Sequence, residues 1–145
     1  MSRRKCICAA AGLLLLAAPA WAAGQTFAAG LDPAPFDAST KPNVQGTGKV
    51  TAVLDGRALT VTGSYSGLPS NATAAHVNMG LAMGVLGDPI GDLKVTGGVN
   101  GEISGKINLS AKQLAALRAK SLYIRLDSEK APDGNLQGWL EPAAN

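Results

Sequence analysis

Residues 110–140 constrain the fold more than any other stretch, because helix, strand and turn signals follow one another there without conflict. Ser110 and Gln113 have the spacing of a capping box, which predicts a short α-helix near residues 110–120. From Leu122 apolar and polar residues alternate, which predicts a half-buried strand, and a second alternating run follows a Pro-Asp-Gly turn. The segment therefore predicts a helix packed beside a β-hairpin.

Alternating runs continue through the middle of the chain, and Asp55-Gly56 marks a second hairpin turn. A glycine-rich loop follows the strand that ends near Met79. These patterns predict an all-β fold, an antiparallel β-sandwich of the immunoglobulin-like or Greek-key type, with one short α-helix near residues 110–120. The alternating runs outside the last hairpin are residues 44–68, 73–79, 93–96 and 102–109.

The N-terminus has the three parts of an export signal. Residues 3–5 are basic, residues 7–18 are apolar, and a small-x-small cleavage motif ends at Ala22. The apolar run is shorter than the roughly 20 residues that a membrane-spanning helix needs, so we expect no membrane anchor after signal removal. The sequence predicts a signal peptide over residues 1–22 and a periplasmic or secreted mature protein. Secretory and twin-arginine export both remain open.

Signal removal changes the charge balance. The chain has 13 Lys and Arg and 10 Asp and Glu residues, and three of the basic residues lie in the signal. The mature protein is therefore formally neutral, which argues against nucleic-acid binding. Cys6 and Cys8 also leave with the signal, so we expect no disulfide.

The mature chain divides into a tail and one domain. Residues 23–43 are rich in Ala, Pro and small polar residues, which predicts a linker or a loosely docked N-terminal arm. Phe27, Leu31 and Phe36 are candidates to pin that arm to the domain. Residues 44–141 are predicted to form the domain.

Four motifs follow one another along the chain: AAHVNMG, a GDP loop before a strand, LSAKQLAALRAKSLYIRL and PDGNLQGWL. In this order they resemble the CHRD domain, the module first recognised in the animal morphogen inhibitor chordin. The chain resembles this family over residues 44–141. The resemblance implies an exported β-sandwich module with no agreed enzymatic activity and, in chordin, association with other extracellular proteins.

The chain departs from the family where the family is most polar. Members commonly carry His-x-His where this chain has His76 and Asn78, and a histidine where it has Asp127. An alternative function is therefore binding of a divalent metal, possibly redox-linked, by His76, Asn78 and Asp127, although this set is poor for zinc or copper. Oxygen-bearing residues around the last turn are a calcium candidate or simply turn formers: Asp127, Glu129, Asp133 and Asn135.

The outer face of the last hairpin is the predicted partner-binding surface. Tyr123 is expected opposite Trp139, and Arg125 opposite Gln137. A Tyr and Trp pair facing outward is typical of interfaces, unless the N-terminal arm covers it.

We found no catalytic or cofactor signature, so we expect neither an enzyme nor a cofactor. The leading interpretation is a non-enzymatic binding or structural module. It would contact an unknown extracytoplasmic protein through the face of the last hairpin and the glycine-rich loop.

Overall fold

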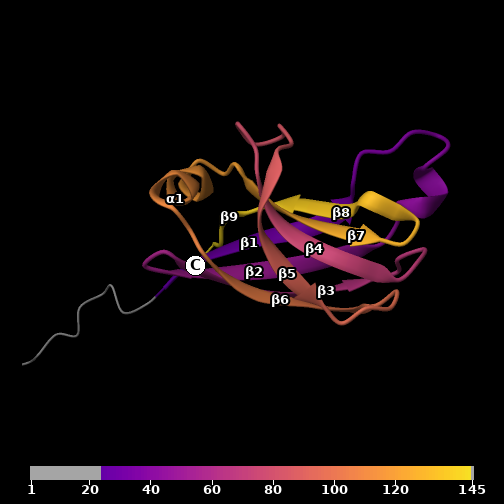
Figure 1. Ribbon diagram of the computed structural model, residues 1–145, viewed down its shortest axis with the longest axis horizontal. Helices are drawn as coiled ribbons and strands as arrows, with labels where there is room; N and C mark the ends of the chain where they lie inside the picture. Colours follow the sequence, from indigo (N-terminus) through magenta and orange to yellow (C-terminus); the bar gives the residue numbers. More distant parts are fainter. Residues whose placement is uncertain (1–23, 145) are drawn as a thin grey trace, which may run out of the picture.

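The computed structural model describes residues 24–144, so the predicted signal peptide lies outside the described residues. The described chain contains nine strands, one α-helix and one short 3-10 helix (Figure 1). In chain order they are β1 (Gln25–Pro33), η2 (Lys41–Asn43), β2 (Thr47–Asp55), β3 (Ala58–Ser66), β4 (Ala72–Met79), β5 (Asp88–Val95), β6 (Gly101–Asn108), α1 (Ala111–Arg118), β7 (Leu122–Ser128), β8 (Ala131–Trp139) and β9 (Glu141–Pro142).

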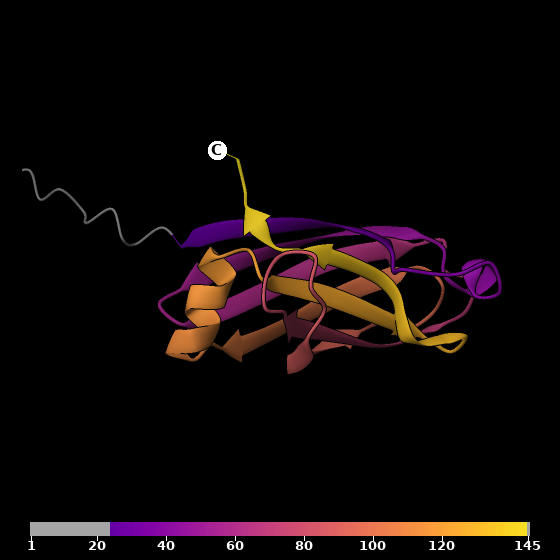
Figure 2. The ribbon, with the colours of Figure 1, turned by 90° about the horizontal axis from the view of Figure 1, so that it is seen from above.

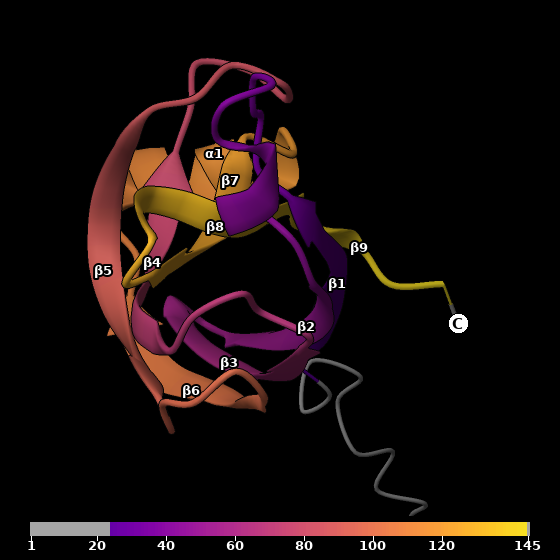
Figure 3. The same ribbon diagram turned by 90° about the vertical axis from the view of Figure 1, so that its right-hand side faces the viewer.

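Eight antiparallel strands close into a barrel. Their order is β2-β3-β6-β5-β4-β7-β8-β1, and β1 also pairs with β2, which completes the circle (Figure 3). The first part of β1, from Gln25 to Leu31, pairs with β2, whereas Asp32 and Pro33 pair with β8. The short β9 pairs with Phe27 and Ala28 of β1 and is the ninth strand of the sheet.

The predicted β-sandwich is therefore wrong, although the all-β class is right. A sandwich and a barrel can contain the same hairpins. Hairpin signals predict only which consecutive strands pair, and they leave the pairing of strands distant in sequence undetermined. The difference lies in one strand, β1, which joins β2 to β8 across the gap that a sandwich would leave open.

The structure corrects part of the linker or arm predicted for residues 23–43. Gln25–Pro33 is a barrel strand, not part of a linker or a loose arm. Phe27 and Leu31 are fully buried in the core, while Phe36, beyond the strand, is 49% exposed. Of the small residues that suggested a linker, Ala29 lies on the buried face of this strand, whereas Ala28 and Gly30 are exposed.

The barrel interior is filled by alternate side chains of the strands. Leu122, Ile124 and Leu126 of β7 are all fully buried and point inward, as the alternating pattern predicts. Burial of each large aliphatic side chain contributes on the order of 1.5–3 kcal/mol. The barrel core therefore supplies the main apolar burial of the described chain.

Helix α1 lies near one end of the barrel (Figure 2). Its predicted capping box is confirmed. The Gln113 backbone N–H donates to Ser110 Oγ at 3.2 Å, and the Ser110 N–H donates to Gln113 Oε1 at 2.9 Å. Leu117 is fully buried against the core, which fixes the short helix to the barrel.

The last hairpin has the predicted pairing and a different turn. Tyr123 pairs with Trp139, and Arg125 with Gln137, as expected. The turn falls at residues 129–130, so the Pro-Asp-Gly stretch lies within β8 instead of forming the turn.

Barrel closure by β1 makes a stability prediction. Phe27→Ala should lower the free energy of unfolding by about 3–5 kcal/mol, because it opens a cavity in the core. Phe36→Ala removes the same atoms from a half-exposed ring and should cost much less. Chemical denaturation of both variants measures the difference. Equal, small effects would mean that residues 25–33 are not part of the closed barrel.

Candidate functional site

The loop between β4 and β5, residues 80–87, carries the largest exposed apolar side chains that lie together on the described surface. We call this segment the apolar loop. It emerges near the α1 end of the barrel (Figures 1 and 2). Leu81 is 94% exposed, and three more apolar side chains of the loop are about half exposed: Met83, Val85 and Leu86. Soluble domains seldom leave such a cluster in water without a binding role.

Side chains from β4 and β7 hold the apolar loop against the barrel. The Tyr123 hydroxyl donates to the Gly87 carbonyl at 2.9 Å and accepts from the Gly87 N–H at 3.1 Å. The Asn78 amide donates to the same carbonyl at 3.1 Å. At the other end of the loop, the Gly80 N–H donates to the Ser121 carbonyl at 2.9 Å. Both ends of the loop are therefore fixed.

Two glycines allow the loop to close this tightly. A Cβ at Gly80 would overlap the carbonyl oxygen of Val85 across the loop, and a Cβ at Gly87 would overlap the carbonyl oxygen of Met79. Backbone atoms cannot move aside as a side chain can. The apolar loop thus has a defined shape that depends on glycine at both of its ends.

The structure corrects the predicted role of Tyr123. Its side chain does point to the outer face of the hairpin, where its ring centroid lies 4.6 Å from that of Trp139. The apolar loop covers it, however, and Tyr123 is 1% exposed. Tyr123 is therefore a support for the loop and is not available to a partner. The covering segment is the apolar loop and not the N-terminal arm considered from the sequence.

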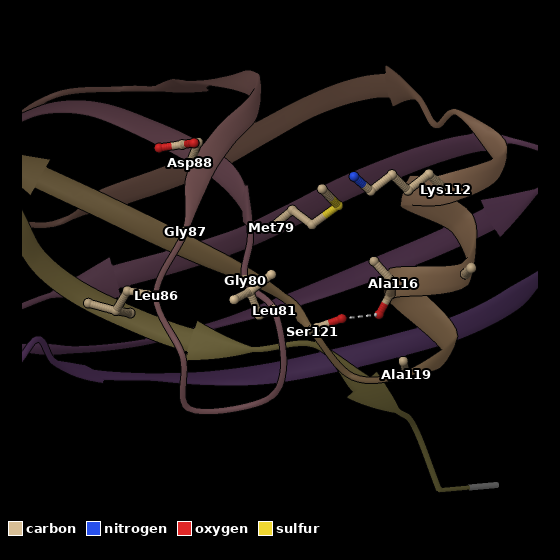
Figure 4. A pocket seen from close by; sticks show the side chains of 11 residues that line it. Met79, Gly80, Leu81, Leu86, Gly87, Asp88, Lys112, Ala116, Ala119 and Ser121 are labelled. Carbon is tan, nitrogen blue, oxygen red and sulfur yellow. Dashed lines mark hydrogen bonds between the residues drawn. The ribbon is translucent and has the colours of Figure 1, made fainter.

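A pocket of about 650 Å³ separates the apolar loop from α1 (Figure 4). Leu81 and Leu86 line it from the loop, and three alanines line it from the helix and its C-cap: Ala115, Ala116 and Ala119. Lys112 stands on the helix side, and Asp88 follows the loop at the start of β5 (Figure 4). The pocket walls are mostly apolar, with one charge of each sign at the margin.

A row of charged and polar side chains crosses the outer face of the barrel beside the loop. His76 Nδ1 lies 2.9 Å from Asp92 Oδ1, and His76 Nε2 lies 3.3 Å from Asp127 Oδ2. Arg125 donates two hydrogen bonds to the buried Asp127 carboxylate, at 2.8 and 3.1 Å. This two-pronged pairing neutralises a carboxylate that is costly to bury alone.

The three residues proposed as metal ligands are not arranged as one donor set. His76 and Asp127 do meet, but Arg125 already occupies both Asp127 oxygens. Each nitrogen of His76 faces a different carboxylate, and the Asn78 amide donates to the Gly87 carbonyl. Within residues 24–144, no group of three or more His, Cys, Asp or Glu side chains has a geometry suited to a metal ion.

The other site predictions also separate in space. Asn135 of the calcium candidate is fully buried, accepts a hydrogen bond from Ser128 Oγ and donates one to the Gln45 carbonyl. The cluster around the last turn is therefore not a single oxygen site. Of the predicted partner-binding residues, Arg125 is engaged with Asp127, whereas Gln137 and Trp139 border a shallow groove that Met83 of the apolar loop also lines.

The exposed face of the apolar loop was only partly foreseen. The glycines predicted a loop, and the sequence interpretation placed that loop in the expected contact surface. No periodicity indicated that the loop folds back over Tyr123. The sequence signal available was the run of four large apolar residues between Gly80 and Gly87, which is unusual for a solvent-exposed loop.

A family model described as the CHRD domain matches residues 27–140, which begins inside β1 and not at residue 44 as expected. No curated protein and no solved structure matches this chain. Among the described residues, no helix has the length and hydropathy that a membrane crossing would require.

The Tyr123 hydroxyl gives the site its testable prediction. Tyr123→Phe should remove two hydrogen bonds and free the apolar loop, so the Gly87 amide should exchange with solvent at least about tenfold faster. Tyr65→Phe is the matched control, because its hydroxyl donates to the Gly97 carbonyl in a different loop. Hydrogen exchange followed by NMR measures both variants. Unchanged exchange at Gly87 in Tyr123→Phe would show that the hydroxyl does not hold the loop.

Proposed function

Because the chain belongs to the CHRD domain family, whose members are typically extracellular modules, we propose that it is a non-enzymatic binding module acting by protein–protein contact outside the cytoplasm. Residues 1–22 would serve as its export signal, and the mature protein would be periplasmic or secreted. The binding surface would centre on the apolar loop, with Trp139 and Gln137 at its margin.

One observation carries this proposal: the apolar loop is exposed, and hydrogen bonds fix both of its ends in the protein alone. Leu81 is 94% exposed, so its burial against a partner would contribute on the order of 1.5–3 kcal/mol. Gly87 is held by Tyr123 and Asn78 before any partner arrives. A loop that is fixed beforehand loses little conformational entropy on binding, which raises affinity for a given contact area.

The charged row on the outer face consists of Asp92, His76, Asp127 and Arg125. Its contacts support a structural role for these side chains, which are of the types that catalysis commonly uses. His76 lies between two carboxylates, and its nearest buried acid, Asp127, is neutralised by Arg125. Within residues 24–144, no serine, threonine or cysteine side chain is hydrogen-bonded to His76. The row therefore reads as a set of cross-strand contacts that stabilise the barrel wall, which fits a module without catalysis.

Metal binding through His76 is the alternative. The 3.3 Å approach of Asp127 to His76 Nε2 favours it, and the existing Arg125 contacts of Asp127 weigh against it. Without rearrangement, a metal ion at either ring nitrogen of His76 would have two protein ligands, the imidazole and one carboxylate. Metal content of the exported protein, compared with that of a His76→Ala variant, distinguishes this alternative from the binding module.

A crosslinking experiment tests the proposed contact surface. A photoreactive benzophenone amino acid at Met83, in the full-length chain expressed in its native cells, should give a covalent adduct with a second protein chain. Met83 is suitable because it is 46% exposed on the apolar loop.

Val99 provides the control position. It is also an apolar residue and is 39% exposed. It lies in the loop between β5 and β6, which follows β5, whereas the apolar loop precedes β5, so the two loops lie at opposite ends of this strand. The same photoreactive residue at Val99 should give little adduct. Equal adducts at the two positions, or none at Met83, would contradict the assignment of the surface to the apolar loop.

A further inference from the structure

The apolar loop and the pocket beside it have complementary properties. The loop projects large apolar side chains, above all Leu81, and the pocket presents alanines from α1 that leave room for such side chains. Figure 4 shows the loop and the helix on opposite sides of this pocket. One patch of the surface therefore carries both a projection and a recess of matching apolar character.

A two-fold symmetric dimer needs this kind of patch. In such an interface the same surface is used by both copies, so every projecting group must meet a recess elsewhere on the same patch. Rotation by 180° about an axis between the loop and the pocket would put each loop over the other copy's pocket.

The charges at the pocket margin fit the same symmetry. Lys112 lies on the helix side and Asp88 on the loop side, and within residues 24–144 neither forms an ion pair within 4.0 Å. The rotation that seats the loop in the pocket would bring Lys112 of each copy toward Asp88 of the other. Two contacts between opposite charges would then flank the apolar centre. An arrangement in which the copies were shifted, so that like charges met, would be disfavoured.

We propose that the occupant of this surface is a second copy of the chain, bound as a two-fold dimer in which each apolar loop seats in the other copy's pocket. This inference rests on the proposed function, because it names the partner of the same binding surface. Trp139 and Gln137 lie beside the dimer contact and are not required by it.

Sedimentation velocity over a concentration series reaching about 0.5 mM tests the dimer on protein purified after expression of the full-length chain. The dimer fraction should rise with concentration. Leu81→Asp should weaken the dimer about 30-fold or more, because it places a charge at the apolar centre, whereas Val99→Asp should leave it unchanged. A monomer throughout the series, or a dimer insensitive to Leu81→Asp, would overturn the proposal.

A charge exchange tests the symmetry itself. Lys112→Asp and Asp88→Lys should each weaken the dimer, since each homodimer would contain two like-charge contacts. An equimolar mixture of the two variants should dimerise again, because both contacts of the mixed dimer pair opposite charges. Both side chains are exposed, so the fold should survive and thermal melting checks this. A mixture that associates no better than either variant alone would contradict the two-fold arrangement.

Failure of the dimer and failure of the binding surface give different results. A monomer that still forms a Met83 adduct with a different protein would overturn the second copy as partner and leave the binding module intact. A monomer that gives no adduct and floats with vesicles of anionic phospholipid would assign the apolar loop to a lipid surface and overturn both proposals.

Discussion

Pairing of β1 with both β2 and β8 closes the sheet, and this closure determines where the protein can make contacts. In the described chain each of the eight barrel strands has a neighbour on both sides, so strand addition at an open edge is not the obvious route to a partner. The interior is filled by core side chains such as Phe27. The surface left for a partner of the proposed kind therefore consists of the loops and the outer face of the barrel wall.

Some side chains on the outer face of the barrel wall hold the apolar loop or join neighbouring strands, and others are exposed to solvent. Tyr123 and Asn78 lie under the apolar loop and hold Gly87, while the row from Asp92 to Arg125 joins neighbouring strands through charged contacts. These side chains are therefore engaged in contacts within the barrel wall. What remains for a partner is the top of the loop, the pocket next to α1 and the half-buried ring of Trp139.

Local signals predicted the helix cap and the strand register, whereas the Pro-Asp-Gly turn of the last hairpin was wrong. The Ser110 capping box and the Tyr123 and Trp139 register both follow from spacing alone, and both are present. Long-range arrangement was not accessible in the same way. Nothing in the composition of residues 25–33 says that this strand bridges two others, and the burial of Tyr123 depends on a loop whose path requires close backbone approaches at Gly80 and Gly87. Spacing identified the candidate residues, and tertiary contacts decide which of them are exposed.

The central claim is that the apolar loop is both exposed and rigid before it binds. Backbone ¹⁵N relaxation of the isolated protein measures this directly for the amides of residues 81–86. Order parameters near those of rigid backbone, about 0.85, are the expected result, since both ends of the loop are held by hydrogen bonds. Values below about 0.6 would describe a flexible segment and would contradict a preformed binding surface.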